Sequence, residues 1–146
     1  MMKTISFIYY GNPVAKGRPK FFRKGNFVGT YTPKKTAQAE DDFKSQALKH
    51  RPKTLITGEI SLEVGFYRGL KKSMSKRAKI DALDGRLNPT TRPDIDNYVK
   101  LVCDALNGLF WKDDAQIINL TMKKRYSETP RIEVILNYEE GGKNHG

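Results

Sequence analysis

The sequence predicts a mixed α/β domain in which helices cover a small mixed sheet. Four segments, residues 4–10, 59–67, 116–126 and 131–138, are rich in β-branched and aromatic residues or alternate apolar with polar residues, as strands do. Two segments near residues 36–50 and 94–106 repeat apolar residues at helical spacing. The length of 146 residues suits one domain. We therefore expect a single domain over residues 1–146, with a disordered tail from about residue 139.

The first strand, residues 4–10, is followed by a basic segment whose Gly, Pro and Asn content argues against a helix. Cations alternate there with aromatic residues such as Phe21 and Tyr31. Cations contact phosphates and exposed rings stack on bases, so this pattern favours a nucleic-acid surface. The alternative is a solvated hairpin whose aromatic residues pack inward. The predicted DNA-contacting cations are Lys16, Arg18, Lys20, Arg23 and Lys24.

The first helix is predicted to run to about His50, before Pro52. Two starts are possible: Thr36 caps the helix, or Thr32 caps it and Pro33 takes the first helical position. The acidic run at residues 40–42 would then lie in the early turns and match the helix dipole. We expect this run to be a structural helix start rather than a metal site.

The strand at residues 59–67 places its alternate apolar residues on one face. A segment rich in Lys and Arg follows, and its middle part, from Ser73 or Ser75 to about Leu83, is predicted to be a short helix with a serine cap. One interpretation is a basic flap over a substrate, and the other is a solvated insertion. The cations proposed to contact DNA here are Lys71, Lys72, Lys76 and Arg77.

The formal net charge of +11 favours a polyanionic partner, nucleic acid above all. Residues 1–80 have a charge balance of +13, whereas residues 81–146 have a balance of −2. The single cysteine, Cys103, excludes an intrachain disulfide and is expected to pack in the core. No apolar run is long enough to span a bilayer, so we expect a cytosolic protein without a membrane partner.

Residues 92–116 concentrate five aspartates in this basic chain: Asp94, Asp96, Asp104, Asp113 and Asp114. Asp94 or Asp96 can cap a helix that runs to about Leu106, with an apolar stripe on one side and Asn107-Gly108 as its end. Two carboxylates at positions i and i+2 can both turn toward one hard cation such as Mg²⁺.

Lys100 lies four residues from both Asp96 and Asp104, so it is placed near a bound phosphodiester. Such a set of carboxylates and a cation suits metal-assisted hydrolysis of a phosphodiester. The alternative is structural: aspartates that cap a helix, an Asp-Asp turn, and an ion pair between Asp104 and Lys100.

The run PDIDNYVKLVCDALNG, followed by DDAQI, resembles the signature of the RusA family of Holliday-junction resolvases. The upstream run KGRPKF…YTP is similar to the basic first loop of one branch of that family. The resemblance implies a small homodimeric, Mg²⁺-dependent endonuclease that cuts paired strands of a four-way DNA junction, with Mn²⁺ as a possible substitute. The better-known branch has a shorter first loop, so its junction contacts do not transfer to this chain.

The resemblance also implies roles for individual residues. Asp94, Asp96 and Asp114 correspond to metal ligands or catalytic acids, and Lys100 to the essential lysine. Asp113 is a possible further ligand. We therefore expect a junction-resolving endodeoxyribonuclease of recombination and repair. The alternatives are a non-catalytic nucleic-acid-binding module and a nuclease that acts mainly on flaps, forks or RNA.

Overall fold

The computed structural model describes residues 1–16, 20–31 and 33–140. Four strands form one mixed sheet in the order β1 (Met2–Tyr10), β6 (Arg131–Glu139), β4 (Ile60–Arg68) and β5 (Ile117–Tyr126). β6 pairs antiparallel with both β1 and β4, whereas β4 and β5 are parallel. A parallel pair needs a crossover, and the segment with helix α3 (Ile95–Leu106) supplies it. The predicted mixed α/β class and all four predicted strands are confirmed.

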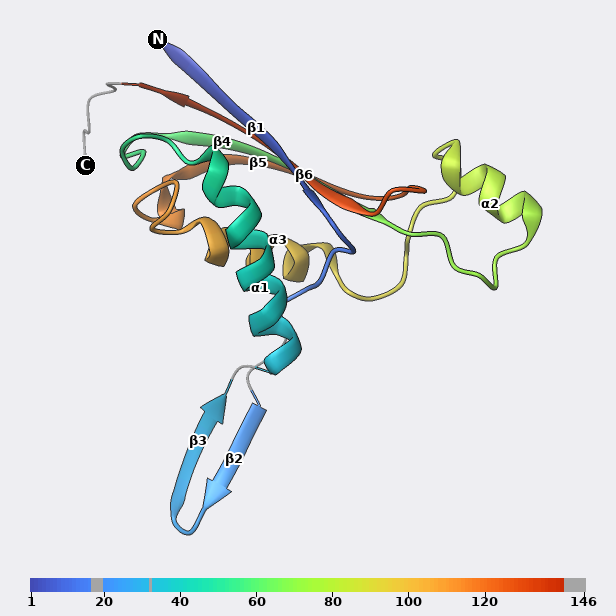
Figure 1. Cartoon of the computed structure of the whole chain (residues 1–146), viewed down its shortest axis with the longest axis horizontal. Helices are drawn as coiled ribbons and strands as arrows, with labels where there is room; N and C mark the ends of the chain where they lie inside the picture. Colours follow the sequence, from blue (N-terminus) through green and yellow to red (C-terminus); the bar gives the residue numbers. More distant parts are fainter. Residues whose placement is uncertain (17–19, 32, 141–146) are drawn as a thin grey trace.

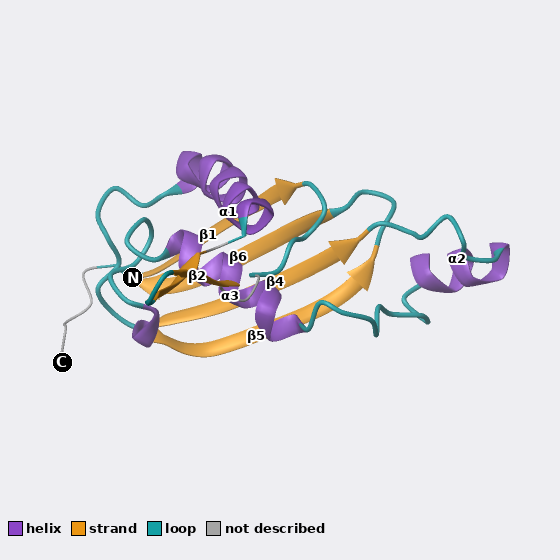
Figure 2. Ribbon diagram, turned by 90° about the horizontal axis from the view of Figure 1, so that it is seen from below, coloured by secondary structure: helices purple, strands orange, loops and turns teal. Residues whose placement is uncertain are grey.

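The helices α1 (Lys34–Ala47) and α3 lie against the same face of the sheet (Figures 1 and 2). A short 3₁₀ helix, η1 (Leu48–His50), extends α1 toward Pro52. The core between sheet and helices contains the apolar stripe of α3 and the inward residues of the strands. Its largest fully buried side chains are Trp111, Tyr98, Phe43, Phe66, Phe110, Ile60, Leu62 and Leu101. None of the helices in the described residues is long and apolar enough to cross a membrane.

The start of α1 differs from the prediction. Pro33 is the N-cap residue, without a side-chain hydrogen bond, and Thr36 is buried inside the first turn rather than capping it. Thr32 lies outside the described residues. The first turn holds no acid. Residues 40–42 lie in the turns that follow it, beyond the turn where the helix dipole acts most strongly, and Lys44 lies in the last turn, where the dipole favours a cation.

The basic segment after β1 forms a hairpin, β2 (Lys20–Lys24) and β3 (Phe27–Tyr31), which projects away from the sheet and helices (Figure 1). Its two-residue turn begins with Gly25 at φ +61°, a conformation that glycine adopts without strain. The hairpin alternative is therefore correct, but its aromatic residues do not pack inward. Phe21 is 77% exposed and Phe27 63% exposed.

The short helix α2 (Lys76–Leu83) lies beyond the end of the sheet (Figures 1 and 2). The Ser75 hydroxyl accepts a hydrogen bond from the backbone N–H of Ala78 at 3.1 Å, which confirms the predicted serine cap. At the other end of the chain, β6 continues through Glu139, so the tail is ordered at a position where disorder was expected. Residues 141–146 lie outside the described part.

Candidate active site

The approach segment, residues 91–93, delivers the chain to α3 and is fixed by cations from two strands. The Lys124 ammonium of β5 donates to the carbonyl oxygens of Thr91 at 2.9 Å and Pro93 at 3.0 Å. The Arg68 guanidinium, at the end of β4, donates to the same Thr91 oxygen at 3.1 Å. The sheet therefore determines where the next residue, Asp94, is placed.

Asp94 and Asp96 present unpaired carboxylates at the start of α3. Asp94 is the N-cap residue in an extended conformation, yet its side chain makes no capping hydrogen bond. Asp96 follows in the first turn, and both residues are exposed. Across the described residues, neither carboxylate takes part in a hydrogen bond or an ion pair with the protein. The predicted capping of α3 by an aspartate side chain is thus wrong, and both carboxylates face solvent at the positive end of a helix.

Asp96, Lys100 and Asp104 lie on the exposed side of α3, opposite its buried stripe, as predicted. The predicted pairing of Asp104 with Lys100 is wrong. Asp104 pairs instead with the ammonium of Lys16 at 3.1 Å, and Glu40 of α1 accepts from the same ammonium at 2.8 Å. No ion pair involves Lys100 within the described ranges, so its charge remains available.

Lys16 ties the first loop to both helices. Its backbone N–H donates to the carbonyl oxygen of Asn97 at 3.1 Å, and its side chain is only 22% exposed. Hydrogen bonds to Glu40 and then Asp104 raise the pKa of Lys16, against the opposing effect of burial. Lys16 was predicted to contact DNA, but its ammonium already has two protein carboxylates as partners.

The two carboxylates after α3 have different surroundings. Asp113 caps the short 3₁₀ helix η2 (Asp114–Gln116): its side chain accepts from the N–H of Ala115 at 3.0 Å, and the Gln116 side chain accepts from the N–H of Asp113 at 2.8 Å. One oxygen of Asp114 accepts from the indole N–H of the buried Trp111 at 2.7 Å. Asp113 is thus engaged in local structure, whereas Asp114 is oriented by a buried ring.

Asp114 does not join Asp94 and Asp96 in one three-carboxylate group. Within the part of the chain that the structure describes, no three His, Cys, Asp or Glu side chains are close enough together to hold a metal ion. The segment that follows α3 leaves from the end opposite Asp94 (Figure 1). Asp114 is close enough to Cys103 to raise the pKa of that thiol, and Cys103 follows Asp96 by roughly 10 Å along the helix axis.

Cys103 is buried, as predicted for a packing residue. Burial, with smaller contributions from Asp114 and Asp104, raises its pKa to about 12. A thiol with this pKa stays protonated at neutral pH, so Cys103 lacks the thiolate character of a nucleophile.

A family model described as "Endodeoxyribonuclease RusA" matches residues 10–137. The chain belongs to the RusA family of endodeoxyribonucleases. It is 46% identical over 137 residues to the uncharacterized protein YqaN of Bacillus subtilis strain 168. The aligned region covers 92% of this chain and 96% of YqaN. The chain is 32% identical over 96 residues to the crossover junction endodeoxyribonuclease rusA of Lactococcus phage r1t, covering 63% of this chain and 66% of the relative. RusA nucleases generally depend on a divalent metal ion.

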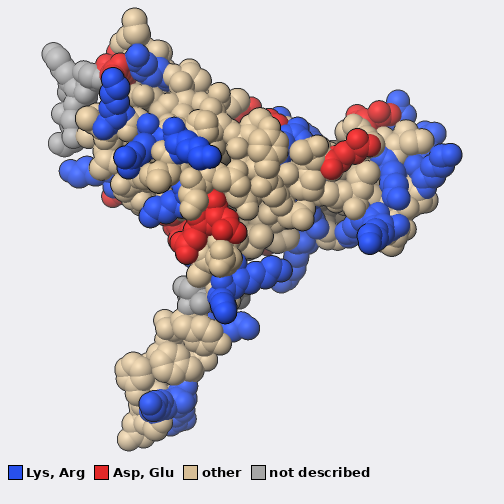
Figure 3. Space-filling model, viewed as in Figure 1, with Lys and Arg blue, Asp and Glu red and all other residues tan. Residues whose placement is uncertain are grey.

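In this RusA-family chain, the other predicted DNA-contacting cations lie on two projections. Lys and Arg side chains gather along the hairpin and around α2 in Figure 3. Lys20, Arg23 and Lys24 are exposed on β2. All four cations proposed for the second basic segment, Lys71, Lys72, Lys76 and Arg77, are exposed. Arg18 lies outside the described residues.

Sequence reasoning missed three residues that hold this site in place: Arg68, Lys124 and Trp111. A signal was present for Lys124. It pairs in register with Phe66 and so shares the helix-covered face of the sheet, where a lysine needs acceptors. Arg68 and Trp111 carry no comparable signal, because their partners, Thr91 and Asp114, are set by loop conformation.

Proposed function

We propose that this RusA-family endonuclease resolves four-way DNA junctions by Mg²⁺-dependent hydrolysis of phosphodiesters, in recombination and repair in the cytoplasm. The observation that carries the proposal is the pair Asp94 and Asp96, two exposed carboxylates without a partner among the described residues, in a chain of net charge +11. Junction cleavage is the activity named for the Lactococcus phage relative. We take residues 1–146 as one catalytic domain.

The donor chemistry of Asp94 and Asp96 fits a magnesium ion. Mg²⁺ is usually bound through one or two carboxylates, with waters and substrate phosphate oxygens completing its octahedral shell. An additional carboxylate is therefore not required before DNA arrives. Asp94 and Asp96 would be the primary ligands. Asp114, which is not grouped with them in this structure, would be the third, and Asp113, occupied as a cap, is the weaker candidate. When bound, such an ion lowers the pKa of a water and offsets negative charge at phosphorus, and Mn²⁺ can take its place.

Lys100 stabilises the negative charge that develops on the phosphoryl oxygens. It lies one turn beyond Asp96 on the same exposed side of α3, and no carboxylate among the described residues competes for its ammonium. A cation at this position acts on the transition state more strongly than on free DNA, because negative charge builds up on the phosphoryl oxygens during the reaction.

The hairpin and the α2 segment hold the arms of the junction. Both project from the body and carry exposed cations, so their contacts are with phosphates and independent of sequence (Figures 1 and 3). Exposed aromatic residues at the hairpin, Phe21 and Phe27 among them, add surfaces on which unpaired bases near a branch point can stack.

We further propose a homodimer, because a two-fold pair places one active site on each of two matching strands. The edge strand β5 supports this proposal. Ile118 is 57% exposed and Leu120 42% exposed, and an exposed apolar edge is a natural site of self-association. Light scattering should show a dimer that Ile118→Asp converts to monomer, whereas Thr121→Asp, on the opposite face of β5, should not.

Cleavage of a synthetic four-way junction tests the function. We expect symmetrical nicks with Mg²⁺ from the parent protein, none from Asp94→Asn, and parent-like activity from Asp41→Asn, an exposed aspartate of α1 that serves as the charge control. Native gels run beside the assay separate binding from cutting. Binding without cleavage in Mg²⁺ and Mn²⁺ would instead indicate a binding module, and faster cutting of flaps, forks or RNA would indicate another natural substrate.

A further inference from the structure

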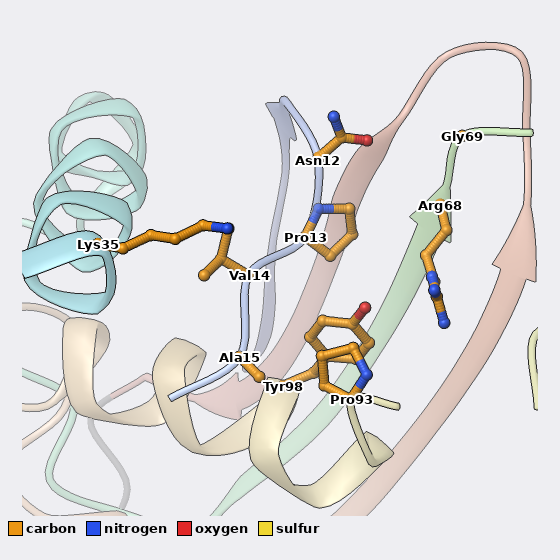
Figure 4. A pocket seen from close by; sticks show the side chains of 9 residues that line it. All are labelled: Asn12, Pro13, Val14, Ala15, Lys35, Arg68, Gly69, Pro93 and Tyr98. Carbon is orange, nitrogen blue, oxygen red and sulfur yellow. The ribbon is translucent and has the colours of Figure 1, made fainter. Parts of the chain in front are cut away.

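A pocket of about 350 Å³ opens beside the approach segment to α3. Its walls come from the chain after β1, the first turn of α1, the end of β4 and the start of α3 (Figure 4). Pro13, Pro93 and the ring of Tyr98 form its apolar floor. Tyr98 is held rigidly there, because its ring stacks on Phe66 with the centroids 4.9 Å apart. Figure 4 shows the Tyr98 hydroxyl pointing into the space between Pro13 and Arg68.

The charge in this pocket is of one sign. Lys35 and Arg68 are the charged side chains in its lining, and Asn12 adds an amide. The two cations enter from opposite sides in Figure 4. Among the residues that the structure describes, no carboxylate lines the pocket and neither cation takes part in an ion pair. Within the described part of the chain, Arg68 donates one side-chain hydrogen bond, to Thr91, so the other N–H groups of its guanidinium have no protein acceptor there.

The position of Lys35 is not explained by a contribution to the stability of the fold. It lies in the first turn of α1, where a cation opposes the helix dipole and no acid offsets it. A cation in this position is unfavourable for the free protein and becomes favourable when an anion binds between Lys35 and Arg68. The pocket therefore has the composition of an anion site: two unpaired cations, polar groups and apolar walls.

The pocket also lies next to the proposed metal ligands. Arg68 binds Thr91, which precedes Asp94 by three residues, a span of at most about 10 Å. One strand of DNA carries a phosphate about every 3.4 Å along the helix axis. A strand held at Asp94 therefore brings a second phosphate, within about three nucleotides of the first, to the mouth of the pocket.

We propose that Lys35 and Arg68 bind one backbone phosphate of the strand being cut, beside the scissile phosphodiester. The inference rests on the proposed function, since it takes the scissile phosphate to lie at Asp94 and Asp96. Both residues position the substrate: they fix the register of the strand, and with it which phosphodiester reaches the carboxylates.

The experiment uses the variants Lys35→Gln and Arg68→Gln, with Lys53→Gln and Arg51→Gln as matched controls. The controls change the same residue types at two exposed positions: Lys53 lines a second pocket, next to the start of β1 and the end of β6, and Arg51 lies two residues before it in the chain. Junction binding is measured without a metal ion, and cleavage with Mg²⁺, at fixed ionic strength. We expect each pocket variant to raise Kd and KM about tenfold and to lower the slope of log K against log salt by about one. Lys35→Gln should leave kcat within about threefold, whereas Arg68→Gln, which also loses its hydrogen bond to Thr91, is judged on Kd and the salt slope.

A scan with a single neutral methylphosphonate identifies the phosphate. At one position within about three nucleotides of the cut, it should weaken binding by the parent protein but not by Arg68→Gln or Lys35→Gln. The proposed phosphate site would be overturned if the pocket variants had the same Kd and KM as the controls. It would also be overturned if the methylphosphonate weakened binding equally in all the proteins. Lys35→Gln separates the pocket from a disturbed approach segment, because among the described residues Lys35 makes no hydrogen bond to residues 91–93, whereas Arg68 does.

The two proposals fail in distinguishable ways. If the parent protein cuts no junction in any metal, the proposed function fails, yet the pocket stands if DNA affinity still falls in both pocket variants and not in the controls. If the parent cuts junctions and the pocket variants behave as the controls do, the pocket fails and the function stands. Competition by inorganic phosphate that is equally strong in the parent and both pocket variants would also count against the pocket.

Discussion

The aspartates at the two ends of α3 differ in whether the protein binds their carboxylates. At its start, Asp94 and Asp96 are exposed and have no side-chain partner among the described residues. Toward and beyond its end, Asp104 pairs with Lys16 and Asp113 accepts from the N–H of Ala115, whereas Asp114 has one oxygen bound by the Trp111 indole and is the proposed third metal ligand. A carboxylate already bound by the protein contributes to its stability, whereas an unbound one is free to bind an ion. The difference separates the acids of a proposed active site from the acids of the framework.

The strongest test of this distinction is to neutralise one aspartate near each end of α3. Asp96→Asn should lower junction cleavage by roughly 100-fold or more, because an anionic ligand is lost, while the melting temperature changes by at most about 2 °C. Asp104→Asn should keep cleavage within about threefold and lower the melting temperature by a few degrees, since Lys16 loses a partner. Cleavage assays and thermal melts on the same samples check both. Equal effects of the two variants would remove the distinction.

The next largest expected difference in cleavage rate is between variants of Asp113 and Asp114. Asn keeps one acceptor oxygen, so Asp113→Asn can still cap η2 and Asp114→Asn can still accept from Trp111. We expect Asp114→Asn to reduce kcat about tenfold or more, and Asp113→Asn to leave it within twofold. Single-turnover cleavage rates decide between them. The reverse order would make Asp113 the third ligand.

Lys16→Met should cost about 1–2 kcal/mol of unfolding free energy, because two carboxylates lose their shared partner. The folded-state pKa of Lys16 is raised, so its contribution is fully present below the unfolded pKa of about 10.4 and is lost as the pH rises through the folded value. Urea titrations of parent and variant should therefore differ at pH 8 and converge at higher alkaline pH. A large loss of DNA affinity without loss of stability would restore Lys16 as a DNA contact.

The smallest effect concerns Cys103, which is buried near the engaged acids. With its pKa raised to about 12, the thiol should react negligibly with a thiol reagent at pH 8 in the native protein and at once in denaturant. Its raised pKa stabilises the fold below the unfolded value near 8.5, and this contribution is lost as the pH rises through the folded value. Labelling at pH 8 followed by mass spectrometry checks the expectation. Rapid native labelling would show that this part of α3 opens.

The sequence alone determined the periodic elements and their buried faces. Alternation in β4 and the three- and four-residue spacing in α3 are local patterns, and Ile60, Leu62, Tyr98 and Leu101 are buried where those patterns place them. The sequence also singled out Asp94 and Asp96 as candidate metal ligands, because they lie two residues apart and need no distant partner to be recognised. It left open whether one of them caps α3, and the structure shows that neither side chain does. The basic hairpin was recognisable from its composition, though the outward direction of its aromatic residues was not.

Only the tertiary structure decided which of the remaining charges are occupied. Lys16 and Asp104 are 88 residues apart in the chain, and Arg68 reaches Thr91 across a 23-residue connection. The sequence offered Lys100 as a possible partner of Asp104, because spacing along a helix is visible in a sequence and contacts between distant segments are not. Folding brings the first loop against α3 and the end of β4 against the approach segment. Those long-range contacts fix Lys16 in the framework and leave Lys35 and Arg68 beside an open pocket.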